Sequence, residues 1–246
     1  MKRKIYNIIV SEIISLLLVI LVSIHACAEP AFFDDVPEPI NGNTNEFSAN
    51  APWYTRAVFW LYHAHILDAA EITDDGYVLY GPNRDITREQ FLAFLGRLAK
   101  EFGKKVTDAP LDRGETLDDF TKWALDNHIL YGTEKGLEKE GLLTRQEMVV
   151  FMMRFADYMG VKLEESNSIK GYSKFIDLEN VSSWAEESMK KAYSFNLIAG
   201  KKNRNGKYSL HPKKTATRAE AAQIVYNYVE TSALHLPCYT GDIADQ

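Results

Sequence analysis

The sequence predicts a mainly α-helical protein built from three helix-loop-helix repeats, with short extended segments in the loops. The first observation behind this prediction is a five-residue box, occurring three times, that begins with an apolar residue and continues Thr-Arg-x-Glu/Gln. The second is that apolar residues at helical spacing follow every box. The third observation is that the aromatic and turn residues before the first box occur in the same order before the last box. The boxes span residues 86–90, 143–147 and 216–220.

Each box has the pattern of a capping box, in which Thr and a Glu or Gln three residues later bond the orphan amides of a helix start. One such box is common and indicates little. Three boxes that each open an amphipathic helix indicate a repeated supersecondary unit. The predicted capping pairs are Thr87 with Gln90, Thr144 with Glu147, and Thr217 with Glu220.

An arginine occupies the first helical position of every box: Arg88, Arg145 and Arg218. The helix dipole disfavours a cation there by about 0.3–1 kcal/mol, so helix propensity does not explain the repeated choice. One interpretation is an acidic ligand, because free amides at a helix start attract anions and a guanidinium adds forked donors. The other is an arginine paired with an Asp or Glu of the fold, tying one repeat to the next. The spacing leaves both open.

The first repeat is predicted over residues 29–103. A helix is expected from about residue 52 to residue 65, with Trp53, Trp60 and Leu61 on its buried face. Asp-Asp-Gly at 74–76 marks a turn, and residues 77–80 are expected to be extended. The first box then opens a helix whose apolar residues continue to Phe102.

The third repeat, predicted over residues 175–230, follows the same plan as the first. Because the order and spacing of the matched residues agree, the two repeats are expected to fold alike. The matched positions are Phe33 with Phe175, Asp35 with Asp177, Trp53 with Trp184, and Ala69 with Gly200.

The middle repeat, predicted over residues 104–160, is degenerate. Aligned on Gly132, it has Thr116 at the Trp position and Ala109 at the Asp position, and the loop before its box is shorter. It keeps a complete box and a helix rich in Met and Phe. Residues 161–174 are expected to form a polar linker, and residues 231–246 an irregular C-terminal tail.

The N-terminal residues 1–28 have the pattern of a secretory signal peptide: a basic start, an apolar run over 8–24 and a small-residue site at 26–28. Simple secretion with cleavage after Ala28 is the favoured reading. A lipoprotein box that lipidates Cys27 is a rival, although His25 is an awkward member of it. A retained membrane anchor is the third alternative, because the apolar run is nearly long enough to span a bilayer.

Taken together, the repeats resemble the S-layer homology (SLH) domain in its usual arrangement of three tandem modules, over about residues 33–230. The resemblance rests on the Phe-x-Asp segment, the Trp, a helix ending in Ile-x-x-Gly, an aromatic-x-Pro element and the box. It implies a pseudo-threefold helical bundle with grooves between adjacent modules. The middle module departs at the Trp and Asp positions and the first has Ala69 for Gly, so the number of binding grooves stays open.

The resemblance implies a secreted cell-surface protein that binds non-covalently to an anionic secondary cell-wall polysaccharide attached to peptidoglycan, often one bearing ketal-linked pyruvate. A box arginine suits the pyruvate carboxylate, and a glycine allows close backbone approach. The tryptophans offer apolar faces for sugar, with core packing an equal alternative, and the aspartates accept hydroxyls or orient loops. The implied ligand-binding residues are Arg88, Arg145, Arg218, Trp53, Trp184, Gly132, Gly200, Asp35 and Asp177.

The alternative is a structural or protein-interaction module of the cell envelope whose grooves no longer bind glycan, motivated by the degenerate middle module. The sequence has no nucleophile elbow, phosphate loop, zinc spacing or calcium loop, so we expect no catalytic residue, cofactor or metal. The net charge of −6 argues against nucleic acid. A protein partner held by the C-terminal tail or by a free or intermolecular thiol at Cys238 stays open.

Overall fold

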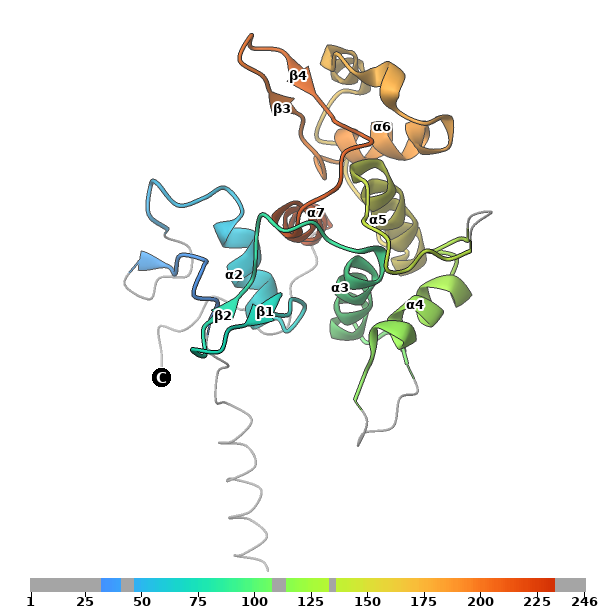
Figure 1. Ribbon diagram of the computed structural model, residues 1–246. Coiled ribbons are helices and arrows are strands. Elements are labelled where there is room, and N and C mark those ends of the chain that lie inside the picture. Colours follow the sequence, from blue (N-terminus) through green and yellow to red (C-terminus); the bar gives the residue numbers. More distant parts are fainter. Residues whose placement is uncertain (1–31, 41–46, 108–113, 133–135, 233–246) are drawn as a thin grey trace, which may run out of the picture. The chain divides into compact units, whose positions relative to one another are not determined.

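The computed structural model describes residues 32–40, 47–107, 114–132 and 136–232 (Figure 1). The chain divides into two units, Met1–Phe32 and Phe33–Gln246, and every element below belongs to the second. The predicted leader with Cys27, and Cys238 in the tail, lie outside the described residues. No helix in the described ranges is long and apolar enough to cross a membrane.

The fold is mainly α-helical, as predicted. The longest described helices start at the boxes, and we call them the box helices: α3 (Arg88–Glu101), α5 (Arg145–Met159) and α7 (Arg218–Thr231). A shorter helix precedes each of them in the chain: α2 (Thr55–His63), α4 (Leu117–Asp126) and α6 (Glu186–Ser194). Three 3-10 helices lie between α5 and α6: η2 (Ile169–Lys174), η3 (Leu178–Asn180) and η4 (Ser183–Ala185).

Two short antiparallel hairpins precede the first and third box helices. In the first, β1 (Glu71–Ile72) pairs with β2 (Val78–Leu79), with Glu71 opposite Leu79. In the second, β3 (Lys201–Lys202) pairs with β4 (Tyr208–Ser209), with Lys201 opposite Ser209. Strand β2 lies within residues 77–80, which the sequence predicts to be extended, whereas its partner β1 was not predicted.

The three box helices contact one another and form the centre of the core (Figure 1). Each shorter helix packs on the box helix of a different repeat: α4 on α3, α6 on α5 and α2 on α7. The apolar residues that the sequence predicts within α3 are fully buried, including Phe91, Phe94 and Leu98, whereas Phe102 follows the helix end and is half-buried. Because every repeat covers a neighbour's box helix, the hydrophobic core is shared by all three.

A ring of backbone hydrogen bonds joins the apolar residues that begin the boxes. The Ile86 amide donates to the Ala216 carbonyl at 3.0 Å, and the Ala216 amide donates to the Leu143 carbonyl at 2.8 Å. The Leu143 amide donates to the Ile86 carbonyl at 2.9 Å, which closes the ring. All three side chains are fully buried, so these bonds are shielded from water.

The three shorter helices end in the same way. Each is followed by a non-glycine residue in the left-handed region: His65 (φ 55°), His128 (φ 59°) and Asn196 (φ 58°). His and Asn are among the residues that tolerate this conformation best. The next amide then reaches back into the helix, as the Ile66 amide does to the Leu61 carbonyl at 2.9 Å.

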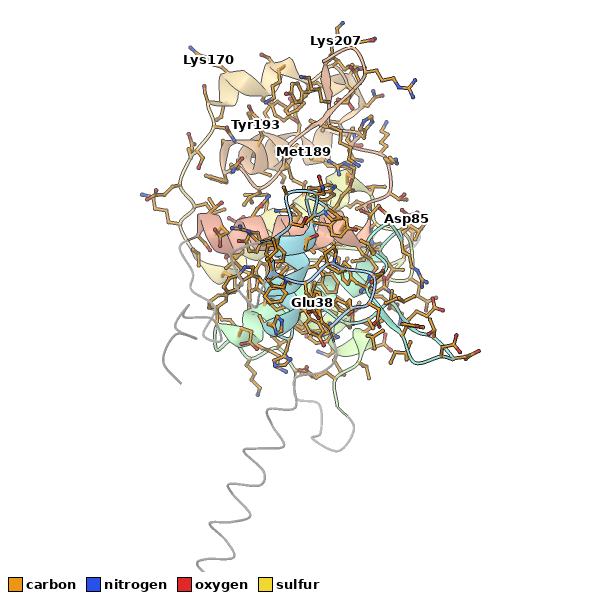
Figure 2. The ribbon with its side chains drawn as sticks, turned by 90° about the vertical axis from the view of Figure 1, so that its left-hand side faces the viewer. Glu38, Asp85, Lys170, Met189, Tyr193 and Lys207 are labelled. Atoms are coloured by element: carbon orange, nitrogen blue, oxygen red, sulfur yellow. The ribbon has the colours of Figure 1, made fainter. Side chains whose placement is uncertain are left out.

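Two sequence predictions about local structure are wrong. The first helix begins at Thr55 rather than near residue 52, so Trp53 lies in the preceding turn, outside the helical period, and is 61% exposed. Residues 161–174 are not only a linker, because they contain η2, whose Tyr172 is buried against the Tyr193 ring of α6. Figure 2 shows Lys170 of η2 and Lys207 of the β3–β4 turn at the same end of the structure as Tyr193.

Candidate functional site

All three boxes make both hydrogen bonds of a capping box. In each, the Thr side chain accepts from the backbone amide three residues later, and the Gln or Glu side chain there accepts from the Thr amide. In the middle box, Glu147 Oε2 accepts from the Thr144 amide at 2.9 Å. Only one carboxylate oxygen is needed for this cap, which leaves the other free for a second partner.

The helix starts are not free anion sites, contrary to one of the two interpretations of the boxes. The first two amides of every box helix donate to carbonyls in the loop before another box, at 2.9–3.0 Å. The protein itself therefore satisfies the donors on which an external acid was expected to dock. The bonds run from Arg88 and Glu89 to Gly141 and Lys139, from Arg145 and Gln146 to Lys214 and Pro212, and from Arg218 and Ala219 to Arg84 and Pro82.

The box arginines are buried and paired within the protein, which supports the other interpretation. Arg88 donates to Glu147 Oε1 at 2.5 Å, and Arg145 lies 2.8 Å from Glu220 Oε2. Each arginine thus reaches the capping glutamate of the next box along the chain. A carboxylate that caps a helix and pairs with an arginine links two repeats. The three arginine residues are 2–8% exposed.

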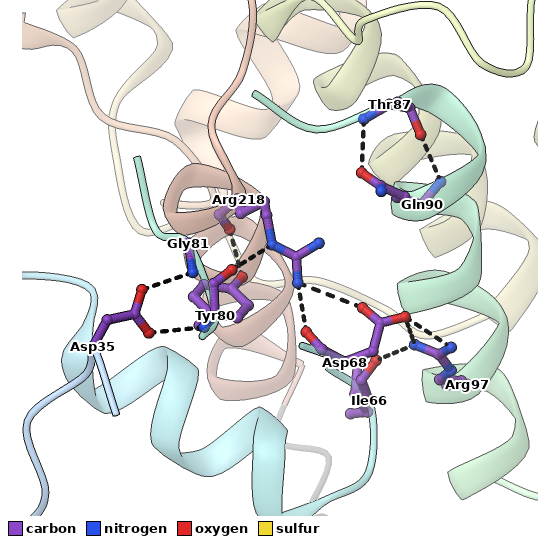
Figure 3. Close-up of polar contacts among 9 residues, drawn as sticks. All are labelled: Asp35, Ile66, Asp68, Tyr80, Gly81, Thr87, Gln90, Arg97 and Arg218. Atoms are coloured by element: carbon purple, nitrogen blue, oxygen red, sulfur yellow. Dashed lines mark hydrogen bonds and ion pairs between the residues drawn. The ribbon is translucent and has the colours of Figure 1, made fainter. Parts of the chain in front are cut away.

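Arg218 has no such glutamate, because the capping residue of the first box is Gln90. Instead its Nη2 donates to the Asp68 carbonyl at 2.5 Å and lies 3.4 Å from Asp68 Oδ1, while its Nε donates to the Tyr80 carbonyl at 2.7 Å (Figure 3). The buried Tyr80 hydroxyl donates back to the Arg218 carbonyl at 2.7 Å. The third repeat is therefore joined to the first, and the cycle of contacts closes.

A cavity of about 430 Å³ lies beside Arg145, and we call it the Trp53 cavity. The exposed Trp53 ring comes from the first repeat and Arg145 from the middle repeat, and the remaining polar residues come from the third. Because three repeats contribute side chains, the cavity exists only in the assembled fold. Its principal lining residues are Trp53, Arg145, Gly200, Lys201, Glu220 and Asn227.

Two cations share one carboxylate in the Trp53 cavity. Glu220 pairs with Arg145 through Oε2 and with Lys201 through Oε1. Burial raises the pKa of Glu220, but the charges and hydrogen bonds of Arg145 and Lys201 outweigh burial, and the net pKa lies below the ordinary value. The three groups together keep one excess positive charge beside an aromatic face, a combination that suits an anionic sugar.

A second cavity of about 430 Å³ lies beside Arg218, and we call it the Asp68 cavity. It has the same construction, with Thr116 of the middle repeat as a lining residue at the position matched to Trp53. Three arginines line it, and its aromatic lining residue is Phe120. Its principal lining residues are Asp68, Arg84, Gln90, Arg97, Thr116 and Arg218.

Asp35 and Asp177 orient loops, which is one of the two roles expected of them. Asp35 accepts from the Tyr80 and Gly81 amides at 2.7 and 2.8 Å (Figure 3). Asp177 accepts from the amides of Leu210 and its successor, both at 2.8 Å. These loops present the Tyr80 and Leu210 carbonyls to Arg218 and Arg145, so the aspartates set the arginine positions indirectly.

The predicted glycines differ in their surroundings. A Cβ on Gly200 would lie 2.2 Å from a carbon of the Phe175 ring, so packing excludes a side chain there. Gly200 also lines the Trp53 cavity. A Cβ on Gly132 would meet nothing closer than 3.7 Å, so packing among the described residues does not require glycine at that position.

Arg88 and Trp184 line neither of the two cavities. The Trp184 residue is 56% exposed in η4, so, like Trp53, it is not a core residue. The guanidinium of Arg88 lies over the Phe151 ring, 5.2 Å from its centroid, in addition to its pair with Glu147. Of the predicted site residues, Trp53, Arg145 and Gly200 therefore line the Trp53 cavity and Arg218 lines the Asp68 cavity.

Several site residues were missed by the sequence analysis. Lys201, Arg97 and Asp68 belong to none of the motifs that the sequence analysis used. A fourth capping box, Thr116 with Asp119, opens α4. Its Thr-x-x-Asp spacing was a usable signal, since Asp at this position accepts a bond much as Glu does. The signal was hidden because Thr116 was aligned with the Trp position.

Comparison with known proteins gives one family match. Residues 174–222, which contain α6, the β3–β4 hairpin and the start of α7, match the model of the S-layer homology domain. This range covers most of the predicted third repeat. The chain therefore contains an S-layer homology domain at residues 174–222.

Larger parts of the chain resemble segments of long proteins. It is 28% identical over 184 residues to an amylopullulanase of Thermoanaerobacterium thermosulfurigenes and 27% identical over 182 residues to exoglucanase XynX of Acetivibrio thermocellus, with 73% of the chain covered in each case. It is 27% identical over 203 residues to an endoglucanase of Bacillus sp. (strain KSM-635), with 79% covered. The matched segments are 9%, 16% and 20% of those proteins. The chain thus spans a fifth or less of each relative.

Proposed function

We propose that this chain, which carries an S-layer homology domain, is a non-enzymatic cell-wall anchor that binds an anionic, pyruvylated secondary cell-wall polysaccharide through the Trp53 cavity. The observation that carries the proposal is the exposed Trp53 ring beside the group of Arg145, Lys201 and Glu220. The ring supplies an apolar face for a pyranose, and the excess cation attracts an acid such as ketal-linked pyruvate. The family match supports anchoring as the general role.

The residue that we propose to bind the acid directly is not a box arginine, although the boxes suggested one. Arg145 is 8% exposed and already bound to Glu220 and the Leu210 carbonyl, so it fixes the cavity and contributes charge. The Lys201 side chain is 48% exposed and can turn towards a ligand while Arg145 keeps its pair with Glu220. Lys201 is therefore the direct partner that we propose for the acid.

We also propose that the three repeats are S-layer homology modules arranged around a pseudo-threefold axis. The ring of Ile86, Leu143 and Ala216, the paired amides of the box helices and the cyclic helix packing support this arrangement. The chain is proposed to act outside the cell, at the wall. The polymer that we propose is acidic and lies outside the cell.

The test is co-sedimentation of the purified chain with wall sacculi that carry their secondary polysaccharide, before and after mild acid removes ketal-linked pyruvate. We expect Trp53→Ala and Lys201→Ala each to raise the apparent Kd for sacculi at least about tenfold, the effect of roughly 1.4 kcal/mol. The matched control is Tyr77→Ala, an aromatic that is 56% exposed and lines neither cavity. Folding is checked for every variant by thermal unfolding.

Loss of retention after pyruvate removal, together with loss in the Trp53 and Lys201 variants, supports the proposal. Retention that survives both substitutions would overturn the assignment of the cavity. Absence of binding to sacculi in the unaltered chain would favour the second candidate, a structural or protein-interaction module of the envelope. One observation favours that candidate: each box arginine forms an ion pair with a carboxylate of the protein itself.

A further inference from the structure

The Trp53 and Asp68 cavities have matching frames, which allows them to be compared position by position. In the first repeat Arg97 donates to the Ile66 carbonyl at 3.1 Å, and in the third Asn227 donates to the Leu197 carbonyl at 3.0 Å. Both donors lie ten residues after the capping Thr of their box helix. The residue two positions after each carbonyl lines the cavity. It is Asp68 in the Asp68 cavity and Ala199 in the Trp53 cavity.

The capping residue explains why the Asp68 cavity needs a carboxylate. In the Trp53 cavity the capping Glu220 also pairs with Arg145. In the Asp68 cavity the capping residue is Gln90, whose single side-chain oxygen accepts from the Thr87 amide at 3.1 Å (Figure 3). Its amide nitrogen is a donor and cannot accept from Arg218. Arg218 therefore lacks the carboxylate that its counterpart has.

Asp68 supplies that carboxylate from inside the cavity. Its Oδ2 accepts from both Nη1 and Nη2 of Arg97 at 3.1 Å, and its Oδ1 lies 3.4 Å from Nη2 of Arg218 (Figure 3). The Asp68 side chain is 42% exposed, whereas those of Arg97 and Arg218 are 24% and 3% exposed. One carboxylate thus sits between two guanidinium groups, at the edge that faces solvent.

The other charged residues that line the Asp68 cavity have partners of their own. Arg84 pairs with Glu71, and Glu115 pairs with Lys100 at 2.7 Å. Asp85 accepts from the Thr215 hydroxyl at 2.9 Å. Arg97 and Arg218 are therefore the two cations of this cavity whose ion pairs are with Asp68, and without that carboxylate they would present an unfilled site for an anion.

We infer that Asp68 is an internal occupant of a carboxylate site formed by Arg97 and Arg218, and that it closes the Asp68 cavity to acidic ligands. A small carboxylate is the chemical class that the emptied site would take, because the occupant is itself a carboxylate on two guanidinium groups. This inference goes beyond the proposed function by separating the two cavities: one is open to an acid and the other is filled by the chain. It does not require that the wall polymer be bound at all.

The test uses sodium acetate and the full chain, with sodium chloride at equal ionic strength as the reference. We expect Asp68→Ala to lower Tm in chloride and to gain a saturable acetate response. At about ten times the acetate Kd, Tm should rise by roughly 3–6 °C, while the unaltered chain shows no difference between the two salts. Where Asp68→Ala does not fold in chloride, its refolding yield in acetate is measured instead.

The second variant is the double substitution Asp68→Ala with Gln90→Glu. A glutamate at position 90 gives Arg218 the partner that Glu220 gives Arg145, so the double variant should recover Tm and lose most of the acetate response. Equal acetate responses in the unaltered chain and Asp68→Ala, or failure of the single variant to fold in either salt, would overturn the inference. These outcomes are independent of sedimentation with sacculi, so failure here and failure of wall binding are distinguishable.

Discussion

Glu220 lies 2.8 Å from Arg145 while it caps the helix that Arg218 begins, so one carboxylate serves two repeats of the chain. Its capping bonds are local, to Thr217, and its ion pair reaches across to the middle repeat. The same double use is found at Glu147, which caps α5 and pairs with Arg88. Helix initiation and the joining of repeats thus depend on the same side chains.

Substitution of Arg145 by Met should destabilise the fold strongly. The change removes the partner of a buried carboxylate and leaves the Leu210 carbonyl without its Nε donor. Breaking a buried pair on one side costs about 3–5 kcal/mol, and we expect the lower end because Lys201 still contacts Glu220. Urea denaturation measures the change in unfolding free energy. Arg84→Met, which breaks a pair between half-exposed side chains, is the control and should cost at most about 1 kcal/mol.

Stability should fall at acid pH because of Glu220. Its pKa is lower in the folded protein than the ordinary value of 4.5, so the contribution to stability is present above pH 4.5 and is lost as pH falls through the folded pKa. Urea denaturation between about pH 6 and pH 3 should show this loss. Glu220→Gln should be less stable at the upper end and show a shallower decline. A variant whose pH profile runs parallel to that of the unaltered chain would contradict the assignment.

Gly200→Ala should destabilise the third repeat, whereas Gly132→Ala should be nearly neutral. A methyl at Gly200 would overlap the Phe175 ring, which is 3% exposed and cannot move outward freely. Overpacking of this kind costs about 1–3 kcal/mol. Thermal and urea unfolding of the pair provide the comparison. Similar losses in the two variants would show that backbone freedom, rather than the Phe175 contact, decides the choice of glycine.

Replacement of His65 by Gly should stabilise the protein. His65 holds φ at 55°, a conformation that costs an L-residue about 1–2 kcal/mol and glycine little, partly offset by the greater freedom of glycine in the unfolded chain. A net gain of about 0.5–1 kcal/mol is expected. The matched control is His63→Gly, in the last turn of α2, which should lose about 1 kcal/mol. Both are measured as midpoints of urea unfolding.

The sequence predicted the helices well because their signals are local. A capping pair is three residues long, and the buried face of α3 follows from helical spacing. The Trp53 position was wrong because a helical period was extended into a turn. The partners of the arginines were not predictable in the same way, since Arg145 and Glu220 are brought together only by the fold. Glu220 was predicted only as a cap, and nothing indicated that its capping oxygen also pairs with Arg145 or that its other oxygen pairs with Lys201.

The Asp68 cavity shows the same limit. Nothing in the spacing of Asp68, Arg97 and Arg218 indicates that they meet, because Asp68 comes from the loop after α2 and the arginines come from two different box helices. The pairing of the helix-start amides was not predictable for a related reason. Whether an amide at a helix start is free depends on which loop lies against it, and that loop belongs to another repeat.

The packing of α2 on α7 has a consequence for how the chain acquires its structure. The earliest of the described helices to leave the ribosome packs on the last of them, so it cannot be covered until the chain has been synthesised through α7. The slow step is expected to be this final closure, because contacts between distant segments are the most costly to form. A chain shortened by its last helix would leave α2 with an uncovered apolar face, and aggregation would compete with folding.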